Sequence, residues 1–121
     1  MENINTLVEG VEELKVYVAD IAPKTITNEI LEDRMRELDN LVNTYGGFII
    51  QKKFQKRDTP DLKTYVGKGK MEEIIEEMVR LECNLLIIGN ILKPRQLFRI
   101  NEQLREKSEE LGLKEPMRAW D

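Results

Sequence analysis

The chain contains no histidine and a single cysteine, Cys83. The first absence excludes imidazole catalysis and histidine-ligated metal sites, and one thiol allows neither an intramolecular disulfide nor a thiolate zinc site. A lone cysteine is typical of a reducing compartment, so we expect a cytoplasmic protein in which Cys83 is a buried structural thiol. No apolar run approaches the roughly 20 residues that span a bilayer. The first residues also lack the basic and apolar regions of a secretory signal.

Positive charge is in the minority, but it is concentrated. The whole chain carries a net charge of −4, whereas residues 51–70 hold seven basic residues against two acidic ones, a local charge of +5. Charge segregated in this way favours a surface that meets an anionic partner. The alternative to such a binding surface is a solvated loop whose lysines only keep the chain soluble. The acidic balance of the whole argues against general binding to nucleic acid, but not against one local basic patch.

Strand-like and helix-like segments alternate along the 121 residues, which are enough for one domain. We predict strands over 14–21, 48–57, 85–88 and 117–120, and helices over 28–45, 71–81 and 94–111. Residues 1–13 show weak periodicity and form an N-terminal extension without an assigned structure. The expected fold is a layered α/β domain, residues 14–121, with a mainly parallel, roughly four-stranded sheet and helices on both faces. The uninterrupted apolar run Leu85 to Ile88 predicts an inner strand.

A glycine-lysine segment, Thr-Tyr-Val-Gly-Lys-Gly-Lys-Met over residues 64–71, precedes the second predicted helix. In a parallel sheet the helices begin at the carboxyl edge of the strands, where their amide groups and dipoles favour anions. Glycines there let a phosphate approach the backbone closely. The segment is not a Walker A loop, since the Gly-x-x-x-x-Gly-Lys-Ser/Thr pattern is absent and Met71 stands where the magnesium-binding hydroxyl would be. It is not a Rossmann fingerprint either. Its glycines would equally serve a simple turn.

Two groups of candidate binding residues follow. The first is the expected phosphate- or RNA-binding loop, made of Tyr65, Gly67, Lys68, Gly69 and Lys70. The second is an expected basic, RNA-facing patch, made of Lys52, Lys53, Lys56, Arg57, Lys93 and Arg95. Neither a catalytic residue nor a metal ligand is predicted. Carboxylates near the predicted edge are Asp20, Asp58 and Asp61, and the four glutamates of the second helix are expected to face solvent: Glu72, Glu73, Glu76 and Glu77.

Residues 64–74 closely resemble the TY(I/V)GKGK-x-EE segment in the N-terminal domain of HflX-type GTPases. Similar matches precede it, in the Tyr-Gly-Gly of residues 45–47 and the Gln-Lys-Arg-Asp-Thr-Pro-Asp of residues 55–61. Others follow it, in Leu-Lys-Pro-Arg-Gln over residues 92–96 and in the closing strand. The resemblance runs from about residue 14 to the end. Lys93 departs from it, because the family usually has Ser or Thr there.

The resemblance implies a ribosome-associated GTPase that binds the ribosomal RNA of the large subunit and dissociates stalled ribosomes. The helical hairpin and the GTPase domain of that family are not found in this sequence, so we expect an excised N-terminal domain that also contacts its own GTPase domain. GTP and Mg²⁺ are implied for that missing domain, and no cofactor for this one.

We therefore expect a non-catalytic module that binds ribosomal RNA. The alternative is a nucleotide-binding domain with weak ATPase activity that uses the Gly-Lys-Gly-Lys loop. A third interpretation is a domain that only packs against the GTPase domain and restrains it.

Overall fold

The computed structural model describes residues 13–59, 62–89 and 92–121, with only the backbone of Lys56. The predicted extension, residues 1–13, falls outside the described part apart from Glu13. The elements run β1 (Leu14–Ala22), α2 (Asn28–Thr44), β2 (Gly47–Lys56), α3 (Lys68–Leu81), β3 (Leu85–Ile88), α4 (Pro94–Glu110) and β4 (Arg118–Trp120). No helix in these ranges is long and apolar enough to cross a membrane.

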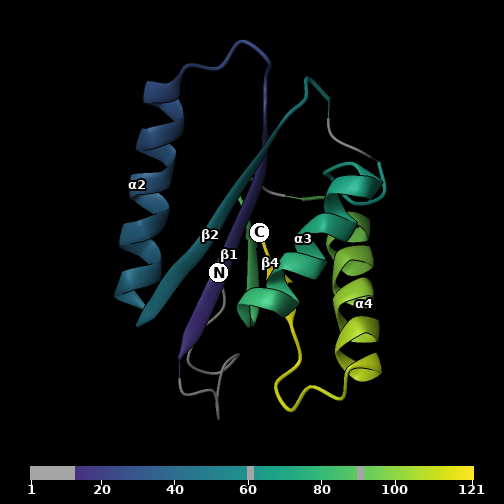
Figure 1. The fold of residues 1–121 in the computed structure, drawn as a ribbon. Helices are drawn as coiled ribbons and strands as arrows, with labels where there is room; N and C mark the ends of the chain where they lie inside the picture. The colour runs from purple at the N-terminus through teal and green to yellow at the C-terminus, as the bar shows by residue number, and fades with distance from the viewer. Residues whose placement is uncertain (1–12, 60–61, 90–91) are drawn as a thin grey trace.

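The four strands form one sheet in the order β2-β1-β3-β4, and every neighbouring pair is parallel (Figure 1). The connection from β1 to β2 moves one way along the sheet, and the connections from β2 to β3 and from β3 to β4 move the other way. Because such crossovers are right-handed, a change of direction places the helices on opposite faces. The predicted α/β fold, with helices on both faces, is confirmed: α2 covers one face, and α3 and α4 cover the other.

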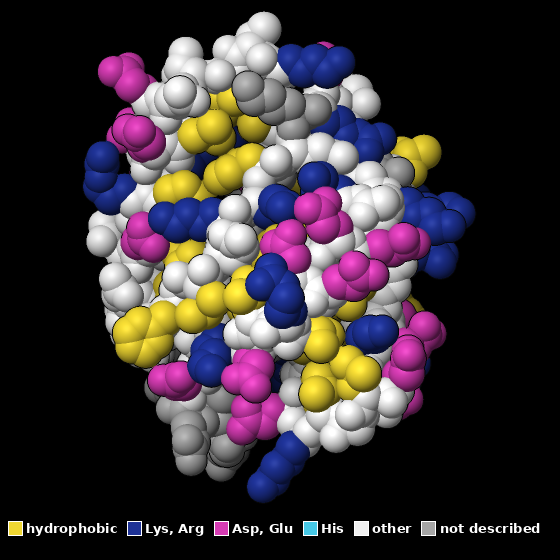
Figure 2. Space-filling view, viewed as in Figure 1, with side chains coloured by type: hydrophobic (Ala, Val, Ile, Leu, Met, Phe, Trp, Pro, Cys, Tyr) yellow, Lys and Arg dark blue, Asp and Glu magenta, His cyan; other side chains and the backbone are white. Residues whose placement is uncertain are grey.

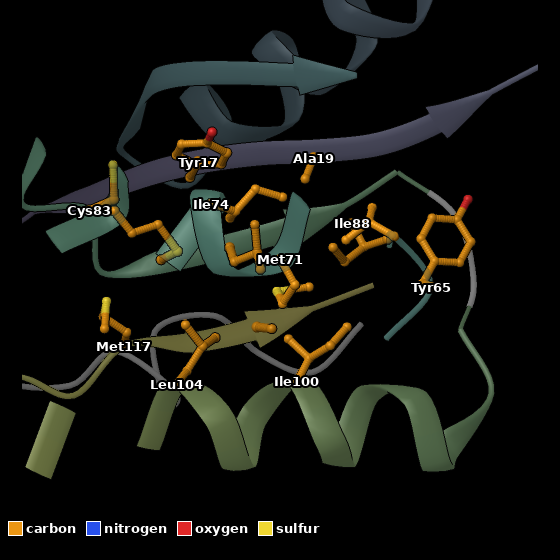
Figure 3. Packing of buried hydrophobic residues seen from close by; sticks show 14 of the residues in the cluster. Tyr17, Ala19, Tyr65, Met71, Ile74, Cys83, Ile88, Ile100, Leu104 and Met117 are labelled. Carbon is orange, nitrogen blue, oxygen red and sulfur yellow. The ribbon is translucent and has the colours of Figure 1, made fainter. Parts of the chain in front are cut away.

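Two hydrophobic layers enclose the sheet. On one face the alternate residues Tyr17 and Ala19 of β1 pack with Ile74 of α3 and Ile100 of α4 (Figure 3). The other face carries Val16 and Val18 beneath α2. All four residues of β3 are buried, which confirms the inner strand predicted from its apolar run.

The helix boundaries depart from the expected ones at two places. Thr27 caps α2, since its hydroxyl accepts a hydrogen bond of 3.3 Å from the Ile30 N–H, but Tyr45 lies beyond the helix and is 39% exposed instead of continuing its buried stripe. α3 begins at Lys68 rather than Met71. Gly67, with extended backbone, occupies the N-cap position, so the first turn starts directly after it.

Candidate nucleic-acid interface

The starts of α2, α3 and α4 lie at the carboxyl edge of the sheet, as parallel topology requires (Figure 1). Lys68 and Lys70 occupy the first turn of α3, and Lys93 and Arg95 flank the start of α4. Lysine at the N-cap of α4 offers no acceptor, and Gln96 compensates, because its side-chain oxygen accepts a hydrogen bond of 3.0 Å from the Lys93 N–H. This edge therefore carries two basic helix starts.

The segment before α3 is fixed by a buried hydrogen bond. Tyr65 is 5% exposed, and its hydroxyl donates to Oδ1 of Asp20 at 2.9 Å. Tyr65 has φ 71°, a left-handed conformation that is uncommon outside glycine and costs free energy. Its ring packs at the end of the hydrophobic layer, beside Met71 and Ile88 (Figure 3). Packing and hydrogen bond together hold this strained residue in place.

Asp20 lies at the centre of the carboxyl edge and is 3% exposed. Its Oδ1 also accepts a bond of 2.7 Å from the Ile21 N–H, and Nη1 of Arg34 lies 3.7 Å from its Oδ2. Burial raises the pKa of Asp20, while the bonds from Tyr65 and Ile21 and the Arg34 charge act in the opposite direction. The Asp20 carboxylate thus has its hydrogen-bond donors and its nearby positive charge within the protein itself.

Glycine is needed where β3 ends. A Cβ on Gly89 would collide with the carboxylate of Asp20 on the adjacent strand. Gly67 sits similarly beneath polar side chains: its N–H donates to Oε1 of Gln55 at 3.0 Å, and a Cβ there would lie 2.9 Å from Nη1 of Arg57. Gly69 differs, because nothing lies within 4 Å of an added Cβ. At Gly67 the protein itself occupies the space that a side chain would need, whereas Gly69 is open, and the close approach of a phosphate to these glycines stays a prediction.

The basic stretch of β2 does not form one surface. Lys52 pairs in register with Val18, and Lys53 with Ala19, so the two lysines point to opposite faces of the sheet. Nζ of Lys52 lies 3.5 Å from Oδ2 of Asp39 on the α2 face. The side chain of Lys56 lies outside the described part. Alternation along a strand splits a run of lysines that looks continuous in the sequence.

Lys53 belongs to a network of five groups between β2, β1 and α3. Its Nζ lies 2.9 Å from Glu73 Oε1 and 3.0 Å from Glu77 Oε1. Glu73 Oε2 also lies 3.1 Å from Nζ of Lys70, and Glu77 Oε2 accepts a bond of 2.6 Å from the hydroxyl of Tyr17, which is fully buried. The expectation that all four glutamates of α3 face solvent is therefore wrong for Glu77, whose side chain is only 15% exposed. Glu72 and Glu76 are exposed, and the side chain of Glu73 stays 44% exposed while it pairs with both lysines.

The contacts within this network shift the pKa values of its members. Hydrogen bonds from Lys53 and Lys70 lower the pKa of Glu73, and bonds from Tyr17 and Lys53 lower that of Glu77. The pKa of Lys53 is raised by the same partners. Burial, and then the bond to Glu77, raises the pKa of Tyr17. Both carboxylates are held ionised, and they compensate the charges of Lys53 and Lys70.

Three of the predicted basic residues lie outside this network of ion pairs. In the part of the chain that the structure describes, Lys68, Lys93 and Arg95 form no ion pair, and all three are exposed. Figure 2 shows basic side chains gathered where α3 and α4 begin, whereas over the middle of α3 they are interleaved with acidic ones. We call Lys68, Lys93 and Arg95 the edge cations. Arg57 instead folds over its own loop, with Nε 2.7 Å from the Thr59 carbonyl oxygen.

The described residues offer little for other chemistry. They contain no group of three Cys, Asp or Glu side chains that would hold a metal ion. Cys83 is 3% exposed, and burial raises the pKa of its thiol to about 11, so it stays protonated as an inert core residue. Asp58 accepts a hydrogen bond of 3.2 Å from the Lys24 N–H, and Asp61 lies outside the described residues.

The sequence interpretation missed Glu73, Glu77 and Tyr17 as partners of the basic residues. A signal was present, because Lys70, Glu73 and Glu77 follow helical spacing on one side of the buried stripe of α3. Their contact with Lys53 depends on the register of β2, which sequence spacing does not provide.

Comparison with known proteins identifies relatives over most of the chain. The family described as GTP-binding GTPase N-terminal matches residues 32–108. GTPase HflX of Lacrimispora saccharolytica is 31% identical over 96 residues, 79% of this chain and 23% of the relative. Proteins of the same name from Alkalihalophilus pseudofirmus and Flavobacterium psychrophilum are 30% and 28% identical over 63% and 73% of the chain. The chain spans only 18–23% of the length of these curated relatives.

Proposed function

Because the chain belongs to the family of GTP-binding GTPase N-terminal domains, we propose that it is the ribosome-binding and regulatory domain of an HflX-type GTPase. Its partner is the ribosomal RNA of the large subunit, and its activity is binding rather than catalysis. Hydrolysis of GTP, with Mg²⁺, belongs to a separate GTPase domain against which this one also packs. The domain spans residues 14–121 and acts in the cytoplasm.

One observation carries the RNA-binding part of this proposal: the edge cations stand at two neighbouring helix starts without acidic partners among the described residues. Cations at a helix start oppose the helix dipole. A phosphate group bound between them reverses that penalty and accepts hydrogen bonds from the free amide groups of the first turn. Lysine and arginine side chains contribute the phosphate contacts that dominate the affinity of proteins for RNA.

The segment from Tyr65 to Lys70 positions this surface. Because Tyr65 is hydrogen-bonded to Asp20 and the Gly67 N–H to Gln55, the start of α3 has little freedom to move relative to the sheet. A preorganised surface loses less conformational entropy when it binds. We therefore assign Tyr65 and Gly67 a positioning role, and Lys68 a direct contact with phosphate.

Titration calorimetry tests the proposal, with large ribosomal subunits, ATP and GTP added to this domain in parallel. The expected result is binding to the subunits that weakens steeply with salt, and no heat of binding from either nucleotide. The same measurement also tests the alternative, a nucleotide-binding domain with weak ATPase activity. Tight binding of ATP without binding to the subunits favours that alternative, and binding to neither favours a domain that only restrains its GTPase domain.

A further inference from the structure

The five-group network places an acidic side chain between two lysines close to the proposed RNA surface. Lys70 stands in the first turn of α3 with the edge cation Lys68, yet its Nζ contacts Glu73 Oε2 at 3.1 Å. Lys53 contacts the other oxygen of the same carboxylate at 2.9 Å. Glu73 therefore binds both lysines at once, one with each oxygen, as a phosphate group would.

The three side chains remain within reach of solvent. The side chains of Lys53 and Lys70 are each 26% exposed, and that of Glu73 is 44% exposed. A contact of this kind is weak and exchanges readily, since exposed ion pairs contribute little free energy. A second anion is thus able to take the place of Glu73 without unfolding the domain.

We propose that Glu73 is an internal competitor that withholds Lys53 and Lys70 from weak anions and releases them to densely charged RNA. This inference rests on the proposed function. A single phosphate group must compete with a carboxylate that is always present at short range. A polyanion held by Lys68, Lys93 and Arg95 brings its next phosphate to the same place, so the exchange becomes intramolecular and favourable. Glu73 thereby sets the threshold for binding and favours polyanions over small ions.

The two lysines should not respond equally to the loss of Glu73. Glu73 is the one acid paired with Lys70 within the described ranges, whereas Lys53 also keeps Glu77 at 3.0 Å. Replacement by glutamine, which preserves the shape of the side chain, should therefore release Lys70 more completely than Lys53. Glu77, in turn, is tied to Tyr17 and serves as the structural anchor of the network.

The test compares Glu73→Gln with Glu76→Gln, which removes the same charge from an exposed position of the same helix that has no ion pair in the described part of the chain. For large ribosomal subunits, Glu73→Gln should bind about two- to fivefold tighter than the parent, the range of an ordinary surface ion pair. The log–log salt slope should steepen by about 0.7 to 0.9, one additional phosphate contact. Glu76→Gln should change neither by a comparable amount.

A double-mutant cycle assigns the gain to Lys70. In a Lys70→Met background, Glu73→Gln should tighten binding much less, because the only lysine left to release is Lys53, which Glu77 still holds. A second readout is the rate at which a water-soluble acetylating reagent modifies each lysine, measured by mass spectrometry without any ribosome. Lys70 should be modified faster in Glu73→Gln than in the parent, and Lys53 should change less.

Two results overturn the inference while the proposed function stands: equal gains from Glu73→Gln and Glu76→Gln, or a gain from Glu73→Gln that is undiminished in the Lys70→Met background. Unchanged acetylation of Lys70 would contradict it as well. If neither the parent nor any variant binds the subunits at low salt, the proposed function is itself wrong, and this inference is wrong with it.

Discussion

The hydroxyl of Tyr65 donates a hydrogen bond of 2.9 Å to Oδ1 of Asp20, and this bond joins the segment before α3 to the central strand β1. Both residues are buried, and 44 residues of chain separate them. The bond holds a non-glycine residue with φ 71° at the point where the chain turns into the basic start of α3. The candidate interface therefore depends on a contact that contributes no charge to it.

Removal of the hydroxyl should weaken the fold. Tyr65→Phe leaves the buried Asp20 carboxylate with one hydrogen bond fewer, and we expect a loss of about 1–3 kcal/mol in the free energy of unfolding. Urea unfolding measures it. The control is Tyr45→Phe at a 39% exposed tyrosine, which should stay within about 0.5 kcal/mol of the parent. Equal effects of the two substitutions would contradict a special role for the Tyr65 bond.

The charge of Asp20 should be unfavourable to the fold at neutral pH. Asp20→Asn removes the charge but keeps an oxygen that accepts from Tyr65 and Ile21. Because burial raises the pKa of Asp20 in the folded protein, protonated Asp20 contributes stability that is complete below its ordinary value of 3.8 and is lost as pH rises through the raised value.

We therefore expect Asp20→Asn to be at least as stable as the parent at pH 7. Its advantage should shrink as the pH approaches 4, when the parent carboxylate becomes protonated. Thermal midpoints of the two proteins across this pH range provide the measurement. An advantage that grows toward acid pH would show that the pKa shift has the opposite sign.

Two glycines at the same edge should respond oppositely to alanine. Gly89→Ala drives a methyl group into the Asp20 carboxylate, and we expect a loss of about 1–3 kcal/mol, as in overpacked cores. Gly69→Ala meets open space within the first turn of α3 and should instead stabilise by about 0.4–1 kcal/mol, since it lowers the entropy of the unfolded chain. Chemical denaturation measures both effects. If Gly69→Ala destabilises the fold, this position needs glycine for its backbone conformation.

Acid should weaken the network between β2 and α3. The folded state lowers the pKa of Glu73 and Glu77 below the ordinary value of 4.5, so their stabilising effect is present above that value and is lost as pH falls through the lowered one. The double variant Glu73→Gln, Glu77→Gln should therefore lose less stability between pH 5 and pH 3 than the parent does. Thermal melting of both proteins across this pH range provides the measurement. An equal loss of stability in the two would exclude these carboxylates as the cause.

Periodicity and run length were sufficient to predict the strands and the α/β class. The four buried residues of β3 and the alternation of strands and helices each follow from local patterns. The start of α3 was misplaced by three residues, because Gly69 and the lysines beside it resemble a loop in sequence, although an open helical first turn accepts glycine. Local patterns alone do not distinguish these two settings.

The candidate site was predicted less completely. Topology alone brings the starts of α3 and α4 to one edge, so their cations were correctly expected at helix starts of a parallel sheet. The separation of Lys52 from Lys53 across the sheet, and the capture of Lys53 by Glu73, depend on strand register and on the distance between β2 and α3. Such contacts between distant segments have no signature in a single sequence.

The most direct test of the account is the salt dependence of binding to large ribosomal subunits when the edge cations are reversed. One variant combines Lys68→Glu, Lys93→Glu and Arg95→Glu. Its control makes the same change of charge at three cations near the other ends of α3 and α4: Arg80, Lys107 and Lys114. Thermal midpoints of both should establish that the fold is retained.

The account predicts that reversal of the edge cations weakens binding and flattens the log–log salt slope by about 0.7 to 0.9 for each lost phosphate contact. The control should keep the slope of the parent, because overall charge affects association only weakly beyond the screening length. If the two triple variants instead bind equally well at every salt concentration, the edge cations do not contact RNA.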